Sequence, residues 1–278
     1  MIWHLVADSA CDLYTLNGCE DKMDFTTIPF TIRIGGNEYI DTADMSISDM
    51  LQANETHDEI AQTACPSPEQ WREVFSAPGP VIAFTISSAL SGSYNSACAG
   101  REMLLEEQPD KQIAIIDSKA TGPEEAMLIW RARDLILEGR PMEEIEKDLN
   151  RTAERIHTSF ALASYRNLIK NGRVSRLIGF IAGHLGFWGI GIGNERGEIA
   201  IRGKARGSKS MIRFLVEEIG KIGIAGKQIL ISHCQNEKDA LALKAALEAA
   251  HAGIEVLVQA TRGLDSFYAE RNGLIIGY

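Results

Sequence analysis

Short runs of apolar residues alternate with amphipathic segments along the first half of the chain. The runs at residues 2–7, 81–86 and 112–116 are continuously apolar, which is typical of strands that a parallel sheet buries on both faces. Apolar residues at helical spacing predict helices at residues 46–52, 68–75, 97–104, 123–137 and 142–156. Alternation of this kind predicts a doubly wound, mostly parallel sheet with right-handed crossovers.

Residues 27–34 form another apolar run, which we interpret as one continuous strand. Gly35-Gly36-Asn37 follows directly, and residues 38–40 resume the strand pattern. Glycine and asparagine between two such runs are typical of a tight turn. The sequence therefore predicts a β-hairpin in this region.

From residue 158 onward, strands and helices no longer alternate regularly. Residues 186–193 are glycine-rich and apolar, and a turn at 194–197 leads into a strand at 198–202. Further strands are predicted at residues 159–163, 228–232, 255–259 and 273–277, and helices at 210–221 and 237–251. At 278 residues, the chain is expected to form two domains, an α/β domain at 1–157 and an α+β lobe at 158–278.

Three of the predicted strands of the first domain end in a pair of polar residues. These pairs are Asp8-Ser9, Ser87-Ser88 and Asp117-Ser118. Ligands of doubly wound sheets bind beyond the carboxyl ends of the strands. The three pairs therefore indicate one binding site at that edge of the sheet.

The turn Ser91-Gly92-Ser93 lies between an apolar strand and the helix that follows it. Free N–H groups and hydroxyls at such a point suit an anion, either a phosphate or a carboxylate. The alternative is an ordinary turn whose serines cap the helix, because helix starts recruit serine routinely. Both interpretations stay open at this stage.

Composition excludes several classes of protein. A formal net charge of −10 argues against a general nucleic-acid binder, which needs an excess of lysine and arginine to neutralise phosphates. No apolar stretch reaches the roughly 20 residues of a membrane span, and the start of the chain has no signal-peptide pattern. Five scattered cysteines without a CxxC motif favour reduced thiols and a cytoplasmic location.

The patterns of common catalytic sites are missing. Ser91 does not lie in a G-x-S-x-G motif, and the six histidines show no metal-ligand spacing. Residues 189–193 contain alternating glycines, but their spacing is not that of a dinucleotide-binding turn. An enzyme acting on a small acyl or phosphorylated substrate at the serine-rich turn remains the alternative to a binding protein.

Basic side chains offer two further candidates. Arg173 follows a glycine in a predicted turn, where its guanidinium is able to bind an anion in bidentate fashion or to hold a backbone carbonyl. Five basic residues between 202 and 213 either bind phosphates or line a solvated hairpin and helix start. They are Arg202, Lys204, Arg206, Lys209 and Arg213.

Seven short segments, in order along nearly the full length, resemble the DegV family of bacterial fatty-acid-binding proteins, which partner fatty acid kinase. They are Ala7-Asp8-Ser9-Ala10-Cys11-Asp12-Leu13, Ile28-Pro29-Phe30 with Tyr39-Ile40-Asp41, Thr63-Ala64-Cys65-Pro66-Ser67, Ile86-Ser87-Ser88-Ala89-Leu90-Ser91-Gly92-Ser93-Tyr94, Ile116-Asp117-Ser118, Asn171-Gly172-Arg173-Val174-Ser175 and Lys204-Ala205-Arg206-Gly207.

The resemblance implies a two-lobe protein that holds one long-chain fatty acid in a tunnel between its lobes. It implies no cofactor, no catalytic activity of the chain itself, and presentation of the acyl group to the catalytic subunit of a fatty acid kinase, with transient contact to a membrane surface. Thr63, Ser91 and the Gly92-Ser93 turn would hold the carboxylate, and Arg173 would lie near the acyl phosphate. Apolar residues of the second lobe would line the tunnel or form an ordinary core: Phe180, Ile181, Leu185, Phe187 and Trp188.

The chain departs from the family pattern at two places. Ala64 and Cys65 replace the usual serine and glutamine, and the family's C-terminal histidine motif is absent. Tyr268 is the candidate to take the place of that histidine. We expect Cys65 to be a structural or pocket-wall thiol, because no basic residue beside it in the sequence would lower its pKa.

Overall fold

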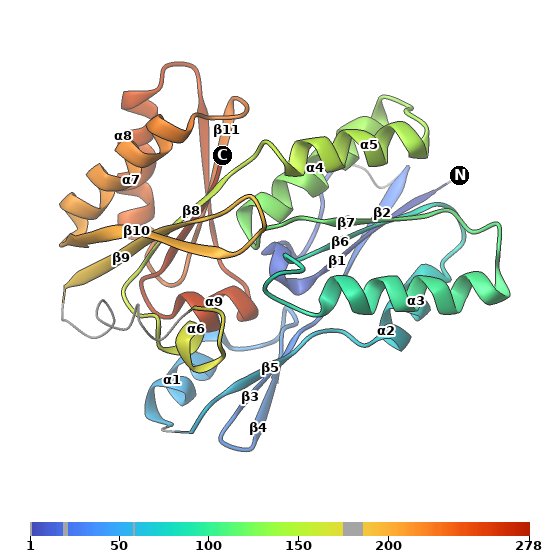
Figure 1. The fold of residues 1–278 in the computed structure, drawn as a ribbon, viewed down its shortest axis with the longest axis horizontal. Coiled ribbons are helices and arrows are strands. Elements are labelled where there is room, and N and C mark those ends of the chain that lie inside the picture. Colours follow the sequence, from blue (N-terminus) through green and yellow to red (C-terminus); the bar gives the residue numbers. More distant parts are fainter. Residues whose placement is uncertain (1, 19–21, 58, 175–185) are drawn as a thin grey trace.

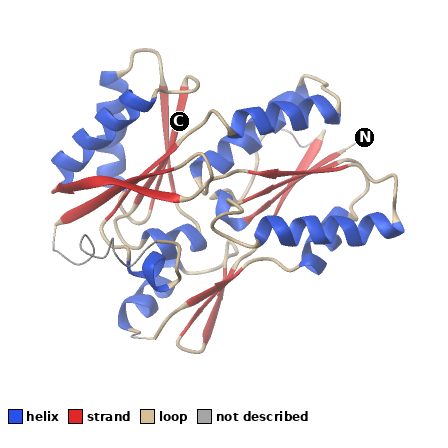
Figure 2. Cartoon of the chain, viewed as in Figure 1, coloured by secondary structure: helices blue, strands red, loops and turns tan. Residues whose placement is uncertain are grey.

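The computed structural model describes residues 2–18, 22–57, 59–174 and 186–278. It has the mixed α/β architecture that the sequence predicts, with a parallel sheet in the first lobe and a mixed sheet in the second (Figures 1 and 2). A small antiparallel sheet lies beneath the point where the two lobes meet.

The first sheet has four parallel strands in the order β2-β1-β6-β7. Their bounds are Met23–Ile28, Trp3–Asp8, Val81–Thr85 and Ile113–Asp117. Helices α4 (Pro123–Leu137) and α5 (Met142–Ala153) cover one face, and α2 (Pro68–Phe75) and α3 (Ser93–Glu107) cover the other (Figure 1). The predicted doubly wound arrangement is confirmed.

The predicted strand at residues 27–34 is wrong, because the chain divides there between two sheets. Strand β2 ends at Ile28, and β3 (Thr31–Ile34) joins an antiparallel sheet with β4 (Asn37–Ile40) and β5 (Gln62–Ala64). Pro29 has no N–H to continue the first ladder. The N–H of Phe30 donates instead to Ser9 Oγ at 3.0 Å. Helix α1 (Ile47–Thr56) follows the hairpin, which is present as predicted.

The second lobe contains a six-stranded mixed sheet in the order β10-β9-β8-β13-β11-β12. The strands are β8 (Thr158–Leu162), β9 (Phe187–Gly193), β10 (Ile199–Arg206), β11 (Gln228–His233), β12 (Glu255–Ala260) and β13 (Leu274–Gly277). Helices α7 (Ser208–Ile222) and α8 (Glu237–Ala250) pack on one face around Leu215, Ile219 and Leu243. Each of these elements was predicted within a few residues of its observed bounds.

The opposite side of this sheet carries two short helices, α6 (Arg166–Lys170) and α9 (Gly263–Ala269). The sequence did not predict α9, because a segment that begins with glycine and contains serine and aspartate has weak intrinsic helix preference. The carboxylate of Asp41, after β4, accepts hydrogen bonds from the N–H groups of Gly263 and Leu264 at 2.9 and 3.0 Å. A side chain some 220 residues away in the sequence therefore caps this helix.

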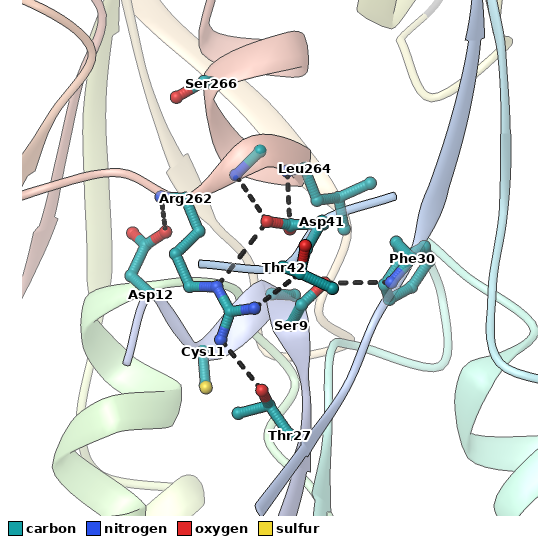
Figure 3. A network of polar contacts seen from close by, with 12 residues as sticks. Ser9, Cys11, Asp12, Thr27, Phe30, Asp41, Thr42, Arg262, Leu264 and Ser266 are labelled. Carbon is teal, nitrogen blue, oxygen red and sulfur yellow. Dashed lines mark hydrogen bonds and ion pairs between the residues drawn. The ribbon is translucent and has the colours of Figure 1, made fainter. Parts of the chain in front are cut away.

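Arg262, immediately before α9, joins the second lobe to the first. Arg262 is only 1% exposed, and its guanidinium donates to the carbonyl oxygen of Leu13 at 2.5 Å. It also donates to the carbonyl oxygen of Asp41 at 2.5 Å and to Thr27 Oγ1 at 3.0 Å (Figure 3). Its Nε lies 3.6 Å from Asp41 Oδ1, and the ring of Tyr14 covers it at 4.3 Å. One arginine thus fixes three segments of the first lobe against α9.

We expect Arg262→Ala to lower the free energy of unfolding by about 3–5 kcal/mol, because it leaves the fully buried Asp41 without its cation. Urea denaturation of the purified variant measures this loss. Arg196→Ala is the matched control, since Arg196 is 81% exposed and its pairing with Glu198 contributes at most about 1 kcal/mol. Equal stability of the two variants would contradict a structural role of Arg262.

Candidate functional site

A pocket of about 840 Å³, counted with its opening to solvent, lies between the two lobes. Its wall is mostly apolar, which is typical of sites for small organic ligands. The apolar side chains come from both lobes: Phe30, Ile86, Leu90, Phe160, Leu162, Leu168, Ile199, Leu264 and Ile275. Polar residues join this wall in two places.

The first polar group comes from β5 and α9. Thr63 lies on the small antiparallel sheet, opposite Ile32, and Tyr268 lies near the end of α9. Thr63 Oγ1 and the phenol oxygen of Tyr268 are 2.8 Å apart and share a hydrogen bond. Both residues line the pocket, so the structure brings together two of the predicted site residues that are 205 positions apart in the sequence.

The predicted turn contributes only Ser91 to the wall of the described pocket. Ser91 Oγ accepts a hydrogen bond from the N–H of Ser93 at 3.3 Å, and its hydroxyl lies within hydrogen-bond reach of the Cys65 thiol. The Ser93 hydroxyl is fully buried and donates to Asp8 Oδ2 at 2.6 Å. Gly92 comes directly before α3, and a Cβ atom added to it would lie 3.7 Å from Cys65 Sγ. Contact of Gly92 and Ser93 with a ligand stays a prediction.

The three polar strand ends meet at the carboxyl edge of the first sheet, where most of their side chains bind residues of neighbouring loops. Asp8 accepts from the N–H groups of Ala10 and Ile86 as well as from Ser93. Asp117 accepts from the N–H and the hydroxyl of Ser88. Burial raises the pKa of Asp8 to about 7. These residues hold the loops that shape the pocket.

Arg173 holds backbone carbonyls, which is one of the two roles that the sequence left open, and contact with an anion stays a prediction. It lies three residues after α6 and lines the pocket. Its Nε donates to the carbonyl of Leu90 at 3.1 Å, and Nη1 donates to the carbonyl of Asn171 at 2.7 Å. Its guanidinium also lies 5.9 Å from the centre of the Tyr268 ring. The positive charge is therefore held close to Ser91 and Tyr268.

Cys65 borders the same region without being activated. Like Leu90 and Tyr268, it packs against the small apolar cluster of Ala10, Phe30, Ile86 and Leu264. Burial raises the pKa of its thiol, so the neutral form predominates at neutral pH. Among the described residues that line the pocket there is no histidine to act as a base for Ser91.

The predicted tunnel residues are placed only in part. Phe180, Ile181 and Leu185 lie outside the described residues. Trp188 packs into the core between the second sheet and helices α7 and α8. Phe187 is stacked under Arg206, whose guanidinium lies 5.6 Å from its ring centre.

The second polar group of the pocket was not foreseen. It consists of Lys119, Thr121, Thr158, Glu198 and Asp265. The Thr121 hydroxyl donates to Asp265 Oδ1 at 2.6 Å, and the Thr158 hydroxyl donates to Glu124. Asp265 and Tyr268 are three residues apart on α9, which places them on the same helix face. Recognition of α9 in the sequence would have supplied this pairing.

The described part of the chain contains neither a cluster of metal ligands nor a membrane-spanning helix. No group of three or more histidine, cysteine, aspartate or glutamate side chains there is arranged to hold a metal ion. No helix in those same residues is long and apolar enough to cross a membrane.

The chain is similar to proteins of known sequence and structure over its full length. The DegV family model matches residues 2–262. A DegV domain-containing protein of Streptococcus pneumoniae is 34% identical over 278 residues, which cover 100% of this chain and 99% of that protein.

Solved structures show the same fold. The fatty acid kinase (Fak) B3 protein of Streptococcus pneumoniae, loaded with linoleic acid, is 34% identical, with a TM-score of 0.96 over 100% of this chain and 99% of that one. A DegV family protein of Eubacterium eligens, loaded with heptadecanoic acid, is 35% identical, with a TM-score of 0.94 over 99% and 98% of the two chains. Because the family model spans nearly the whole sequence and relatives align from end to end, the chain belongs to the DegV family.

Proposed function

We propose that this protein binds one long-chain fatty acid in the pocket between its lobes, with the carboxyl group at Ser91, Thr63 and Tyr268. The observation that carries this proposal is an apolar pocket with three hydroxyl groups gathered on its wall. Apolar side chains from both lobes favour burial of a hydrocarbon chain, because apolar surface leaves water on binding. Two structural neighbours of more than 30% identity carry a fatty acid.

Hydroxyl groups are suited to hold a carboxyl group without a full salt bridge. The Ser91 hydroxyl is able to turn from the Cys65 thiol and donate to a ligand, and the Thr63–Tyr268 pair has one proton to direct outward while sharing the other. A hydrogen bond to a charged acceptor contributes about 1.5–3 kcal/mol, more than a bond between neutral groups. Arg173 adds a positive charge beside these hydroxyls while its own N–H groups are partly occupied by carbonyls.

We further propose that the bound acyl group is presented to a fatty acid kinase, which phosphorylates the carboxyl group. The resemblance to the fatty acid kinase B3 protein supports this role. In this account the chain supplies binding and orientation, and the partner supplies the phosphoryl-transfer chemistry. The pocket supports this division, because Ser91 has no histidine beside it among the described lining residues and the Cys65 thiol is kept protonated.

Organic extraction of the purified protein, followed by mass spectrometry, tests the proposal directly. We expect close to one fatty acid per chain. Protein that carries no lipid, binds none on titration and hydrolyses acyl esters would instead support an enzyme acting at the same turn.

Ser91→Ala should weaken fatty-acid binding by about 10- to 100-fold, because one hydrogen bond to the charged carboxylate is lost. Isothermal titration with a single fatty acid measures the change. Ser88→Ala is the matched control: Ser88 belongs to the same turn, but its hydroxyl donates to Asp117 at 2.5 Å instead of lining the pocket. An unchanged affinity of the Ser91 variant, or an equal loss in the control, would remove Ser91 from the site.

Thr63→Val and Tyr268→Phe should each weaken binding by several-fold, and the double variant should lose less than the product of the two changes. The reason is that the two hydroxyls act as one hydrogen-bonded unit, and energies within such a unit are not additive. A double-mutant cycle on the dissociation constants provides the measurement. Strictly additive losses would show that the two hydroxyls bind independently.

Arg173→Ala should leave fatty-acid binding within a few-fold but lower acyl-phosphate formation by a partner kinase about tenfold or more. A dianionic phosphate needs a cation more than a carboxylate held by hydroxyls does, and a planar guanidinium matches phosphate oxygens. Comparison of binding, phosphorylation and melting temperature separates the possibilities. If Arg173 only braces the carbonyls of Leu90 and Asn171, both activities and the melting temperature should fall together.

A further inference from the structure

Two carboxyl groups, one from each lobe, face each other beside the pocket. Asp12 follows the short 3-10 helix Ser9–Cys11 of the first lobe, and Asp265 lies on α9 of the second. Their Oδ2 atoms lie 2.8 and 2.5 Å from the point where a Cβ on Gly122 would stand. Gly122 has a φ of +60° and opens this space between the two carboxyl groups.

Each carboxyl group has its Oδ1 atom held by a donor and its Oδ2 atom left over, and the Ser232 hydroxyl also lies within hydrogen-bond reach of the Asp12 carboxyl group. Asp12 Oδ1 accepts from the backbone N–H of Arg262 at 2.6 Å, and Asp265 Oδ1 accepts from the hydroxyl of Thr121 at 2.6 Å. Neither Oδ2 atom has a donor among the described residues, although both are fully buried. Two buried acceptors that face each other without a donor need a proton between them.

We propose that Asp12 and Asp265 share one proton, and that this contact holds α9, and with it Tyr268, in position on the first lobe. Asp265 is a positioning residue in this scheme, since it acts on the carboxyl site through the helix that it shares with Tyr268. The second part of the inference rests on the proposed function, because it concerns the binding of a fatty acid.

The surroundings favour the shared proton over two ionised carboxylates. Glu125 of α4 lies beside the pair, fully buried and without a hydrogen-bond partner in the described structure, and Asp8 and Asp41 add further acidic groups from the ends of β1 and β4. The facing cation is Arg262, whose guanidinium is already bound to Leu13, Thr27 and Asp41. Figure 3 shows Asp12 against the backbone of Arg262, with Asp41 on the other side of that arginine.

Burial raises the pKa of Asp12 to about 7, and burial together with the neighbouring Asp12 raises the pKa of Asp265 well above its ordinary value. A carboxyl group whose pKa is higher in the folded than in the unfolded state binds more protons when folded. The free energy of unfolding therefore falls as the pH rises from about 4 through these folded-state values. The pair is fully protonated at acidic pH and loses protons as the pH rises from about 7 into alkaline solution.

Asp265→Asn tests the pair, because the amide N–H donates to Asp12 Oδ2 at any pH and replaces the shared proton. In ligand-free protein, the wild type should lose more stability than the variant as the pH rises. The unfolding equilibrium constant of the wild type, divided by that of the variant, should therefore rise by about tenfold between pH 6 and pH 9. Asp12→Asn serves as a second variant of the same pair. Asp148→Asn is the control: this partly buried residue of α5 pairs with Arg131, which lowers the pKa of Asp148, so the profile of the variant should follow the wild type between pH 6 and pH 9.

Infrared spectra add a readout that does not depend on stability. The band of protonated carboxyl groups should lose intensity near neutral pH in the Asp265 and Asp12 variants, but not in the Asp148 variant. Parallel stability profiles of wild type and Asp265→Asn, together with an unchanged carboxyl band, would overturn the shared proton.

Titration with linoleic acid from pH 6.5 to pH 9 tests the link to the pocket. The wild type should lose about tenfold more affinity over this range than Asp265→Asn. Protonation of linoleic acid itself affects both proteins equally and therefore cancels in the comparison. Equal pH profiles of binding, with different profiles of stability, would show that the pair exists but does not position Tyr268. Absence of linoleic acid binding in every variant would refute the proposed function and leave the stability and infrared tests of the pair valid.

Discussion

The buried contact between Arg262 and Asp41 is the interaction on which the relation of the two lobes depends. Asp41 belongs to the first lobe and caps α9 of the second, while Arg262 reaches back to the carbonyls of Leu13 and Asp41. Isolated ion pairs of this kind gain little net stability, because removing two charges from water is costly. Their directional hydrogen bonds instead select one arrangement, in which α9 lies at the junction of both lobes.

The pocket follows from that arrangement. Because α9 is fixed at Gly263 and Leu264, its residues Leu264, Asp265 and Tyr268 line the pocket between the lobes. Thr63 meets Tyr268 only because β5 belongs to the small sheet that the division after Ile28 creates. The site is therefore a property of the interface and does not belong to either lobe alone.

The sequence predicts the elements of this fold well where their periodicity is local. Strands β1, β6 and β7 and helices α2 and α4 appear where apolar runs and helical spacing place them, and α2 and α4 begin at a proline in their first turn. It fails where a distant partner decides the structure. The division between β2 and β3 depends on Ser9 binding the N–H of Phe30, and α9 depends on its cap by Asp41.

The candidate site shows the same limit. Thr63, Ser91, Arg173 and Tyr268 were predicted and all line one pocket, because family motifs and polar strand ends mark these positions. The same patterns also marked Ser93, whose hydroxyl is spent on Asp8. A serine that holds a loop and a serine that is free to bind a ligand look alike in a sequence, since the difference lies in which acceptor the fold brings within reach.

Buried acidic side chains hold the loops and the helix that form the polar parts of the pocket wall. Asp8, Asp12 and Asp265 each use at least one carboxyl oxygen to hold a backbone N–H or a hydroxyl of a loop or helix at the interface. An alanine at these positions would leave those donors unpaired in a region from which water is excluded. Burial of these acidic groups in the interface costs desolvation free energy. Their hydrogen bonds in return hold the loops in the positions that shape one apolar pocket.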